Sequence, residues 1–228
     1  MSTLLLRLAG PMQSWGVGSK FDIRATQKEP TKSGVIGLLA AAMGVKRDDS
    51  DTLEKLSQLR FGIRVDQEGT LLKDFHIAHS VKSSYVTYRY YLCDAVFLCG
   101  LESDNQEELL QYENALRHPV FPLFLGRRSC SPTLPIVLGI REYDLETALK
   151  NEKPLTENPG MMRIVVDALE SENTRAIVKD VPVSFNPRRR EYSYRKYRET
   201  ILPGNKQMEH NPFAEVEAEN VSDANGVE

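Results

Sequence analysis

The apolar positions change their period several times along residues 1–140, which predicts strands and helices in alternation. Residues 33–45 are apolar on almost every side, as in a helix that is buried all round. Residues 60–66 alternate between apolar and polar positions, which is the period of a strand, whereas 105–117 have the spacing of an amphipathic helix. The same reasoning predicts strands at 3–8, 71–78, 85–101 and 134–140 and a short helix at 51–59.

The main elements therefore follow the order β-α-β-β-α-β, with the short helix as an addition. This is the order of a ferredoxin-like α+β domain, which is also that of the RNA-recognition motif. In such a domain two helices cover one face of an antiparallel sheet and the other face is free. RNA-recognition motifs hold RNA on the free face, so we expect a ligand there.

Beyond residue 150 the pattern is all β. Residues 154–160 contain two prolines and a glycine, which is typical of a linker. Residues 210–228 combine low hydrophobicity with one sign of charge, which predicts a disordered acidic tail. We therefore expect a ferredoxin-like domain at 1–150, a smaller β extension at 151–209, with strands at 161–169, 174–178 and 192–202, and the tail at 210–228.

Composition indicates an ordinary globular protein. The 228 residues are 41% apolar and 27% charged. The sequence has neither a run of about eighteen apolar residues that could span a membrane nor a secretion signal, so we expect a cytoplasmic protein without membrane contact. Cys93, Cys99 and Cys130 have the spacing of neither a disulfide framework nor a zinc site, so we expect no metal.

The distribution of charge is more informative than the net charge of −3. Residues 210–228 hold five acids and no lysine or arginine, which leaves 27 acids against 29 bases in the rest of the chain. A mildly basic body with clustered bases is compatible with an RNA contact but does not require one.

A tight loop at residues 10–16 (GPMQSWG) follows the first strand. Gln13 offers a donor and an acceptor, and Trp15 offers a flat ring on which a base can stack. The alternative is that Trp15 fills the core and Gln13 braces the loop. We expect Trp15 and Gly16 to shape the loop and Gln13 to lie nearer a bound RNA.

The start of the buried helix, at residues 30–34 (PTKSG), is a candidate phosphate site. Its free N–H groups and partial positive charge attract anions, and Lys32 and Ser33 would add contacts. Arg47, beyond the end of the helix, could reach another phosphate. The alternatives are ordinary capping by Thr31 or Ser33 and a solvated cluster of ion pairs around Arg47.

The segment around the predicted turn at 82–84 combines bases with aromatic rings, among them His76, Lys82, Tyr88 and Arg89. Rings stack on unpaired bases and cations contact phosphates, so this mixture fits an RNA contact built on strands. A histidine, a lysine and a tyrosine could also cleave RNA by general acid–base catalysis. The third interpretation is an ordinary tyrosine-rich strand.

Two further basic segments lie later in the chain. Arg127 and Arg128 follow a glycine and offer guanidinium groups suited to phosphate, although adjacent surface arginines are often only solvated. Residues 188–198 hold the densest mixture of bases and tyrosines, which fits RNA binding and a solvated surface equally. No catalytic triad, carboxylate pair or dinucleotide-binding fingerprint stands out, which favours binding over catalysis.

Four of these segments together resemble one family, CasD. CasD is the RAMP-type subunit that holds the 5′ handle of the guide RNA in the type I-E CRISPR complex Cascade. The segments occur in the family's order and are 4–16 (LLLRLAGPMQSWG), 30–49 (PTKSGVIGLLAAAMGVKRDD), 90–97 (YYLCDAVF) and 124–131 (FLGRRSCS).

The resemblance implies a ferredoxin-like palm, an inserted β-hairpin thumb, here at about 71–97, and a smaller C-terminal β part. It implies no cofactor and no catalytic residue, because another subunit cleaves the precursor RNA in type I-E systems. The alternative is a metal-independent endoribonuclease that processes repeat RNA, as in a type I-C relative.

The partners that the resemblance implies are the crRNA, through its 5′ handle, the backbone-filament subunit, the large subunit that reads the PAM, and target DNA through the complex. Base pairing with the guide would read the target sequence. The residues that we expect to contact RNA are Gln13, Trp15, Gly16, Lys32, Ser33, Arg47, His76, Lys82, Tyr88, Arg89, Arg127 and Arg128.

Overall fold

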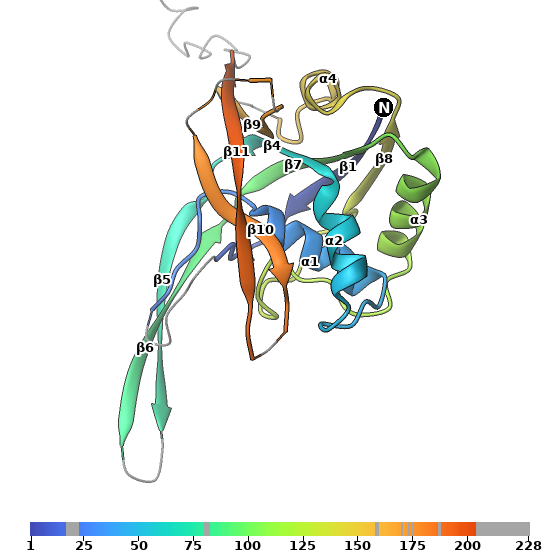
Figure 1. The fold of residues 1–228 in the computed structure, drawn as a ribbon. Coiled ribbons are helices and arrows are strands. Elements are labelled where there is room, and N and C mark those ends of the chain that lie inside the picture. The colour runs from blue at the N-terminus through green and yellow to red at the C-terminus, as the bar shows by residue number, and fades with distance from the viewer. Residues whose placement is uncertain are drawn as a thin grey trace, which may run out of the picture.

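A seven-stranded antiparallel sheet forms the centre of the computed structural model (Figure 1). The α+β class that the sequence predicts is confirmed, because helices and antiparallel sheets are both present. Across the sheet, the strands are β10 (Ile177–Ser184), β11 (Glu191–Leu202), β9 (Met162–Asp167), β4 (Arg60–Gln67), β7 (Val96–Ser103), β1 (Ser2–Ala9) and β8 (Val137–Arg141). The structure describes residues 1–16, 23–79, 83–157, 160–169, 171–172, 174, 176–186 and 188–203.

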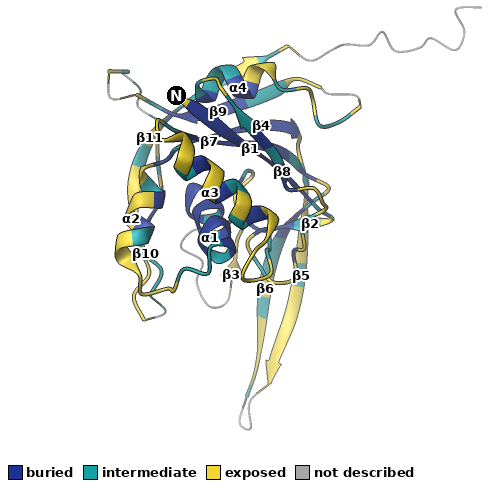
Figure 2. Ribbon diagram, turned by 90° about the vertical axis from the view of Figure 1, so that its right-hand side faces the viewer, coloured by how far each residue is buried: buried dark blue, intermediate teal, exposed yellow. Residues whose placement is uncertain are grey.

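Three helices pack against one face of this sheet: α1 (Lys32–Ala42), α2 (Ser50–Gln58) and α3 (Gln106–Arg117) (Figure 2). Side chains alternate along β1, so Leu4, Leu6 and Leu8 join the core beneath these helices and Leu5 faces the other way. Gly44, just beyond the end of α1, has a φ of +73°, a conformation in which glycine commonly terminates a helix.

The opposite face is not free, which corrects our expectation. A fourth helix, α4 (Leu145–Asn151), covers part of it and shares a second core with Leu5 and Leu98. Gly100 makes room for this helix, because an added Cβ would lie 2.5 Å from Cδ1 of Leu145. Sequence reasoning missed α4 because a helix of seven residues shows too little of a helical period.

A long hairpin of β5 (Thr70–His79) and β6 (Ser84–Cys93) projects from the body (Figure 1). Near its base, β6 also pairs with two short strands, β2 (Met12–Gln13) and β3 (Ile23–Arg24). The sequence predicts this hairpin at about 71–97, with its second strand inside one β segment at 85–101, and both C-terminal bounds need correction. Asp94 adopts a φ of 58°, which ends β6, and β7 then starts in the main sheet.

The C-terminal strands extend the main sheet, because β9 pairs with β4. The strand predicted at 174–178 lies further along the chain, as β10, and continues through Pro182. Proline is tolerated there since β10 is an edge strand. The acidic tail at 210–228 lies outside the described residues, and among those that are described no helix is long and apolar enough to cross a membrane.

Candidate nucleic-acid interface

A broad groove of about 1640 Å³ opens on the helical side of the molecule. Its walls come from α1, from the loop after α1, from residues 121–128 and from the turn between β10 and β11. The groove therefore does not lie on the sheet face that the sequence led us to expect. Six bases line it, Arg24, Lys46, Arg47, Arg127, Arg128 and Arg190, against two acids, Asp48 and Asp49.

These six bases share a second property. None of them forms an ion pair with a carboxylate of the described residues. A concave surface with unpaired positive charge concentrates the field and attracts a polyanion. Three of the six, Arg47, Arg127 and Arg128, are bases that the sequence predicts as RNA contacts.

The floor of the groove is built on the start of α1. Thr31 caps this helix, and its hydroxyl accepts a hydrogen bond from the Gly34 N–H at 3.2 Å. Gly34 permits close contact with the first loop, since an added Cβ would lie 2.7 Å from Cε3 of Trp15. Ser33, one of the predicted contacts, is buried at the edge of the groove, with its hydroxyl 3.4 Å from that of Thr31.

The loop at residues 10–16 supports the groove from below. Trp15 is 1% exposed, and its indole N–H donates to Oε1 of Gln13 at 3.0 Å. Nε2 of Gln13 donates to the carbonyls of Leu8, at 3.3 Å, and Ala95, at 2.7 Å. Gln13 is fully buried, so it braces the loop and does not face the groove, contrary to our expectation. Gly16 is exposed at the groove edge.

The first loop also packs against the segment that carries Arg127 and Arg128. The Ser14 N–H donates to the carbonyl of Leu125 at 3.0 Å. Gly126 has a φ of +93°, and a Cβ at this position would lie 1.8 Å from the Ser14 carbonyl oxygen. Only glycine fits this approach, so two of the sequence segments that resemble CasD form one structural unit.

Lys32 does not face a phosphate, which is a second correction. Its side chain is 7% exposed, and Nζ lies 2.9 Å from Oδ2 of Asp167. The backbone N–H of Lys32 donates to Oδ2 of Asp180 at 2.9 Å. The anion at the start of α1 is therefore a carboxylate of the same chain, and the site predicted for phosphate is occupied.

Arg195 completes this buried ionic cluster of Lys32, Asp167, Asp180 and Arg195. Its guanidinium contacts both oxygens of Asp180, at 2.7 and 2.9 Å, and Oδ1 of Asp167, at 2.9 Å. Burial would lower the pKa of Arg195, but the hydrogen bonds and charges of both carboxylates outweigh burial and raise it. The cluster holds two positive and two negative groups, so it is internally compensated.

The rim of the groove carries the other predicted arginines. Arg47 and Arg128 are exposed, whereas Arg127 is half-buried and donates to the carbonyl of Arg24 at 2.7 Å. The Arg127 guanidinium also lies 4.8 Å from the ring centre of Tyr91. Burial raises the pKa of Tyr91, but hydrogen bonds from Ser129 and Arg127, and the charge of Arg127, together lower it. The Arg127 guanidinium therefore places positive charge on the inner, half-buried side of the rim as well.

The remaining predicted contacts lie on the hairpin, outside the groove. His76 is exposed and lies 2.6 Å from Oδ2 of Asp74, and Tyr88 stacks under Nζ of Lys73 at 4.2 Å from its ring centre. Arg89 is half-buried near the base, and Lys82 lies outside the described residues. The structure thus divides the predicted residues into a groove set, a hairpin set and a buried set.

The register of the hairpin bears on the nuclease alternative. His76 is paired with Thr87, and Phe75 with Tyr88, so the side chains of His76 and Tyr88 leave opposite faces of the hairpin. The two groups cannot meet at one scissile phosphate. His76 and Tyr85 do share a face, since Tyr85 is paired with Ala78.

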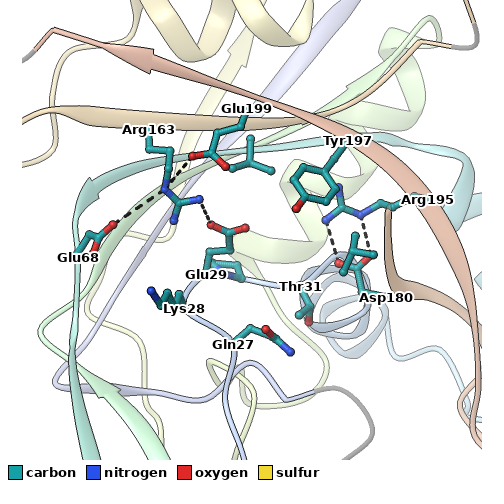
Figure 3. A pocket seen from close by; sticks show the side chains of 13 residues that line it. Gln27, Lys28, Glu29, Thr31, Glu68, Arg163, Asp180, Arg195, Tyr197 and Glu199 are labelled. Atoms are coloured by element: carbon teal, nitrogen blue, oxygen red, sulfur yellow. Dashed lines mark hydrogen bonds and ion pairs between the residues drawn. The ribbon is translucent and has the colours of Figure 1, made fainter. Parts of the chain in front are cut away.

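A second hollow, of about 420 Å³, differs from the groove in its charge (Figure 3). Arg163 reaches into it and meets three carboxylates, those of Glu29 at 2.6 Å, Glu199 at 3.7 Å and Glu68 at 4.0 Å. Surplus negative charge repels phosphate. This hollow is therefore not a candidate for RNA.

Several groove residues were not among the predicted contacts. Phe121 and Phe124 follow α3 in a stretch that contains Pro119 and Pro122 and carries no local signal of RNA binding. Arg190 and Tyr192 belong to the basic and aromatic run at 188–198, whose composition fits RNA binding and a solvated surface equally. Their contribution depends on which way the turn between β10 and β11 faces, and that is a tertiary property.

Comparison with known proteins identifies the family. The family model described as CRISPR-associated protein (Cas_Cas5) matches residues 3–198. The chain belongs to this family. The match covers every residue that lines the groove and extends well past residue 131, where the last of the four segments that resemble CasD ends.

Individual CRISPR-associated proteins are also similar to this chain. The chain is 37% identical over an alignment of 175 residues to CRISPR system Cascade subunit CasD of Escherichia coli (strain K12), with a coverage of 68% of this chain and 78% of that protein. A chain of the solved "CRISPR RNA-guided surveillance complex" has a TM-score of 0.75 at 33% identity, covering 89% of this chain and 91% of that one. "Crystal structure of Cas protein" has a TM-score of 0.71 at 40% identity, covering 88% and 95%.

Proposed function

We propose that this Cas5-family chain is a subunit of a type I-E Cascade surveillance complex, where it binds the 5′ handle of the crRNA and caps one end of the backbone filament. The observation that carries the RNA contact is the groove with six bases that have no carboxylate partner among the described residues. The similarity to a Cascade subunit and to a chain of an RNA-guided surveillance complex supports the setting. The backbone-filament subunit and the large PAM-reading subunit are the proposed neighbours.

We also infer that β1, β4, β7 and β8 with α1 and α3 form a ferredoxin-like palm of the RAMP type. The strand order β8-β1-β7-β4, with both helices on one face, supports this inference. The hairpin of β5 and β6 is inserted between β4 and β7, as a thumb would be. Phe75 and Tyr85 on this hairpin are each 62% exposed, which fits a surface that RNA or a neighbouring subunit covers.

The test of the groove removes two charges from its rim. Arg47→Gln with Arg128→Gln should weaken binding of a fluorescently labelled single-stranded handle RNA to the full chain. Because each phosphate contact on a single strand contributes about 0.7 to the salt slope, the slope of log K against log salt should fall by about 1.4. Arg127 is spared because it also packs on Tyr91.

A matched control removes the same charge elsewhere. Arg117→Gln with Lys150→Gln neutralises two exposed bases that pair with Glu113 and Glu146 and lie outside the groove. This variant should bind with the affinity and salt slope of the parent chain. Equal effects of the two double variants would mean that net charge, and not the groove, drives RNA binding.

We propose further that the chain is not a nuclease. The opposite orientation of His76 and Tyr88 supports this proposal. His76 and Tyr85 lie on the same face of the hairpin, so the nuclease alternative still has a candidate pair that can be tested. The full chain should leave repeat RNA intact in EDTA over hours. A product that ends in a 2′,3′-cyclic phosphate, lost in His76→Ala, would establish the metal-independent endoribonuclease instead.

A further inference from the structure

One wall of the groove comes from the C-terminal part of the chain. Phe185, Arg190 and Tyr192, at and beside the turn between β10 and β11, line the groove together with residues that precede them by 57 positions or more. In Figure 1 this turn lies at the lower end of the two strands, next to α1 and α2. Both helices contact β10. The wall therefore depends on how firmly the two strands are held against the helices.

Three contacts hold them. The ring of Phe185 lies against the bare side of Gly37, with Cζ 3.6 Å from the position of an added Cβ. The hydroxyl of Ser57 in α2 donates to the carbonyl of Pro182 at 3.0 Å. The buried ionic cluster joins β10 and β11 to the first residue of α1, because Asp180 accepts hydrogen bonds from the Lys32 N–H and from Arg195. Figure 3 shows the contact between Arg195 and Asp180. A wall fixed in this way loses little entropy when a ligand binds.

Two neighbouring arginines in this turn differ in whether a carboxylate pairs with them. Arg189 is paired with Glu191 and does not line the groove. Arg190 lines the groove, is exposed, and has no carboxylate partner in the described chain. Tyr192 follows two residues later, so in an extended segment both side chains project to the same side. A free guanidinium beside a half-buried ring matches the two parts of a nucleotide, its phosphate and its base.

We propose that Arg190 and Tyr192 bind one nucleotide of the RNA in the groove, with Arg190 on its phosphate and Tyr192 stacked on its base. This inference rests on the proposed function and adds to it a C-terminal subsite. The C-terminal strands then contribute directly to RNA binding, in addition to extending the sheet.

The two roles have different signatures in a salt titration of the full chain with labelled single-stranded handle RNA. Arg190→Gln should lower the salt slope by about 0.7, because one phosphate contact is lost. Tyr192→Leu should weaken binding about tenfold at every salt concentration without a change in slope, because stacking is not ionic. Tyr192→Phe keeps the ring and should bind as the parent chain does.

Neighbouring side chains supply matched controls. Arg189→Gln removes a base from the same run, and Tyr194→Leu removes a ring that is 65% exposed on the same strand, and neither residue lines the groove. Both should leave affinity and slope unchanged. The four altered side chains are exposed or half-buried, and thermal melting should confirm that each variant folds as the parent chain does.

The outcomes separate this inference from the proposed function. If Arg190→Gln and Tyr192→Leu bind RNA normally while Arg47→Gln with Arg128→Gln does not, the subsite is wrong and the groove stands. Loss of binding to Cascade subunits without loss of RNA binding would also overturn the subsite, in favour of a protein contact. If the parent chain does not bind RNA, or the rim variant binds normally, the proposed function itself fails.

Discussion

Positively charged side chains occur in two opposite settings in this molecule, in the buried ionic cluster and on the rim of the groove. Lys32 and Arg195 are almost fully buried, and each is held by carboxylates. Arg47 and Arg128 are exposed and have no carboxylate partner in the described chain. A buried charge must be paired, whereas an exposed charge can stay unpaired because water and counter-ions solvate it. Only the second kind is free to exchange its counter-ions for RNA phosphates.

This difference separates stability from binding. The buried ionic cluster joins β9, β10, β11 and the start of α1, so its loss should be felt in folding. The rim bases make few contacts with the rest of the chain, so their loss should be felt in RNA affinity.

The largest effect is expected from Arg195→Met. This substitution leaves Asp180, whose side chain is 1% exposed, without its bidentate partner. Removal of one member of a buried ion pair costs about 3–5 kcal/mol, because the remaining charge stays desolvated. Urea unfolding of the full chain should show a loss of that size, whereas Arg128→Met should change the free energy of unfolding by less than about 0.5 kcal/mol.

A double variant sharpens this result. Adding Asp180→Asn to Arg195→Met removes the uncompensated charge, while the amide oxygen can still accept from the N–H of Lys32. We expect part of the lost stability to return. If Arg195→Met proves as mild as Arg128→Met, the cluster is solvated in solution and the comparison is wrong.

The second effect concerns the support of the rim. Gly126→Ala puts a Cβ 1.8 Å from the Ser14 carbonyl oxygen at a residue whose φ is +93°. The strain of a positive φ and the steric clash together should cost about 2–4 kcal/mol in the free energy of unfolding. RNA affinity should also fall, because Arg127 and Arg128 shift with the backbone.

The control for this change is Gly160→Ala, where an added Cβ meets nothing within 4 Å. It should change the free energy of unfolding by less than about 0.5 kcal/mol. A Gly126→Ala chain that unfolds like Gly160→Ala would mean that the loop at residues 10–16 yields easily and that the rim is not rigid.

Much of the fold follows from the sequence because its signals are local. The apolar periods of residues 33–45 and 60–66 and the stop at Gly44 depend on neighbouring positions, and the structure contains α1, β4 and a positive φ at Gly44. Local signals were too weak for α4, and they gave no sign that Asp94 would divide the segment at 85–101.

The site could be predicted only in part, because the sequence around a charged residue does not show which distant residue it pairs with in the fold. Lys32 and Arg47 read alike in sequence, yet Asp167 lies 135 positions from Lys32 and decides its role. Gln13 has the sequence signal of a polar loop residue, yet both ends of its amide are bonded within the fold, the nitrogen to the carbonyl of Ala95 and the oxygen to the indole N–H of Trp15. The pairs Arg127–Arg128 and Arg190–Tyr192 meet at one groove through packing that no single segment encodes.

The smallest effect is expected from an acid on the rim, Asp49. Its carboxylate caps α2 by accepting from the N–H of Thr52 at 3.0 Å and from the Thr52 hydroxyl at 2.8 Å. The same carboxylate lies in the groove, where it opposes RNA phosphates. Asp49→Asn keeps an amide oxygen for capping and removes the charge, so RNA affinity should rise about twofold with little change in stability. Asp49→Ala should raise affinity equally but lower the melting temperature.

The pH dependence of that loss follows from the pKa. Hydrogen bonds from the backbone and side chain of Thr52, with a smaller contribution from the charge of Lys55, lower the pKa of Asp49 below its ordinary value of 3.8. A carboxyl group whose pKa is lower in the folded chain stabilises folding above its unfolded pKa, and this contribution disappears as pH falls through the folded value. The difference in melting temperature between the parent chain and Asp49→Ala should therefore be largest near neutral pH and shrink below about pH 4. A constant difference across this range would mean that the carboxylate charge does not contribute to the cap, and an unchanged RNA affinity in both variants would mean that Asp49 does not face the bound strand.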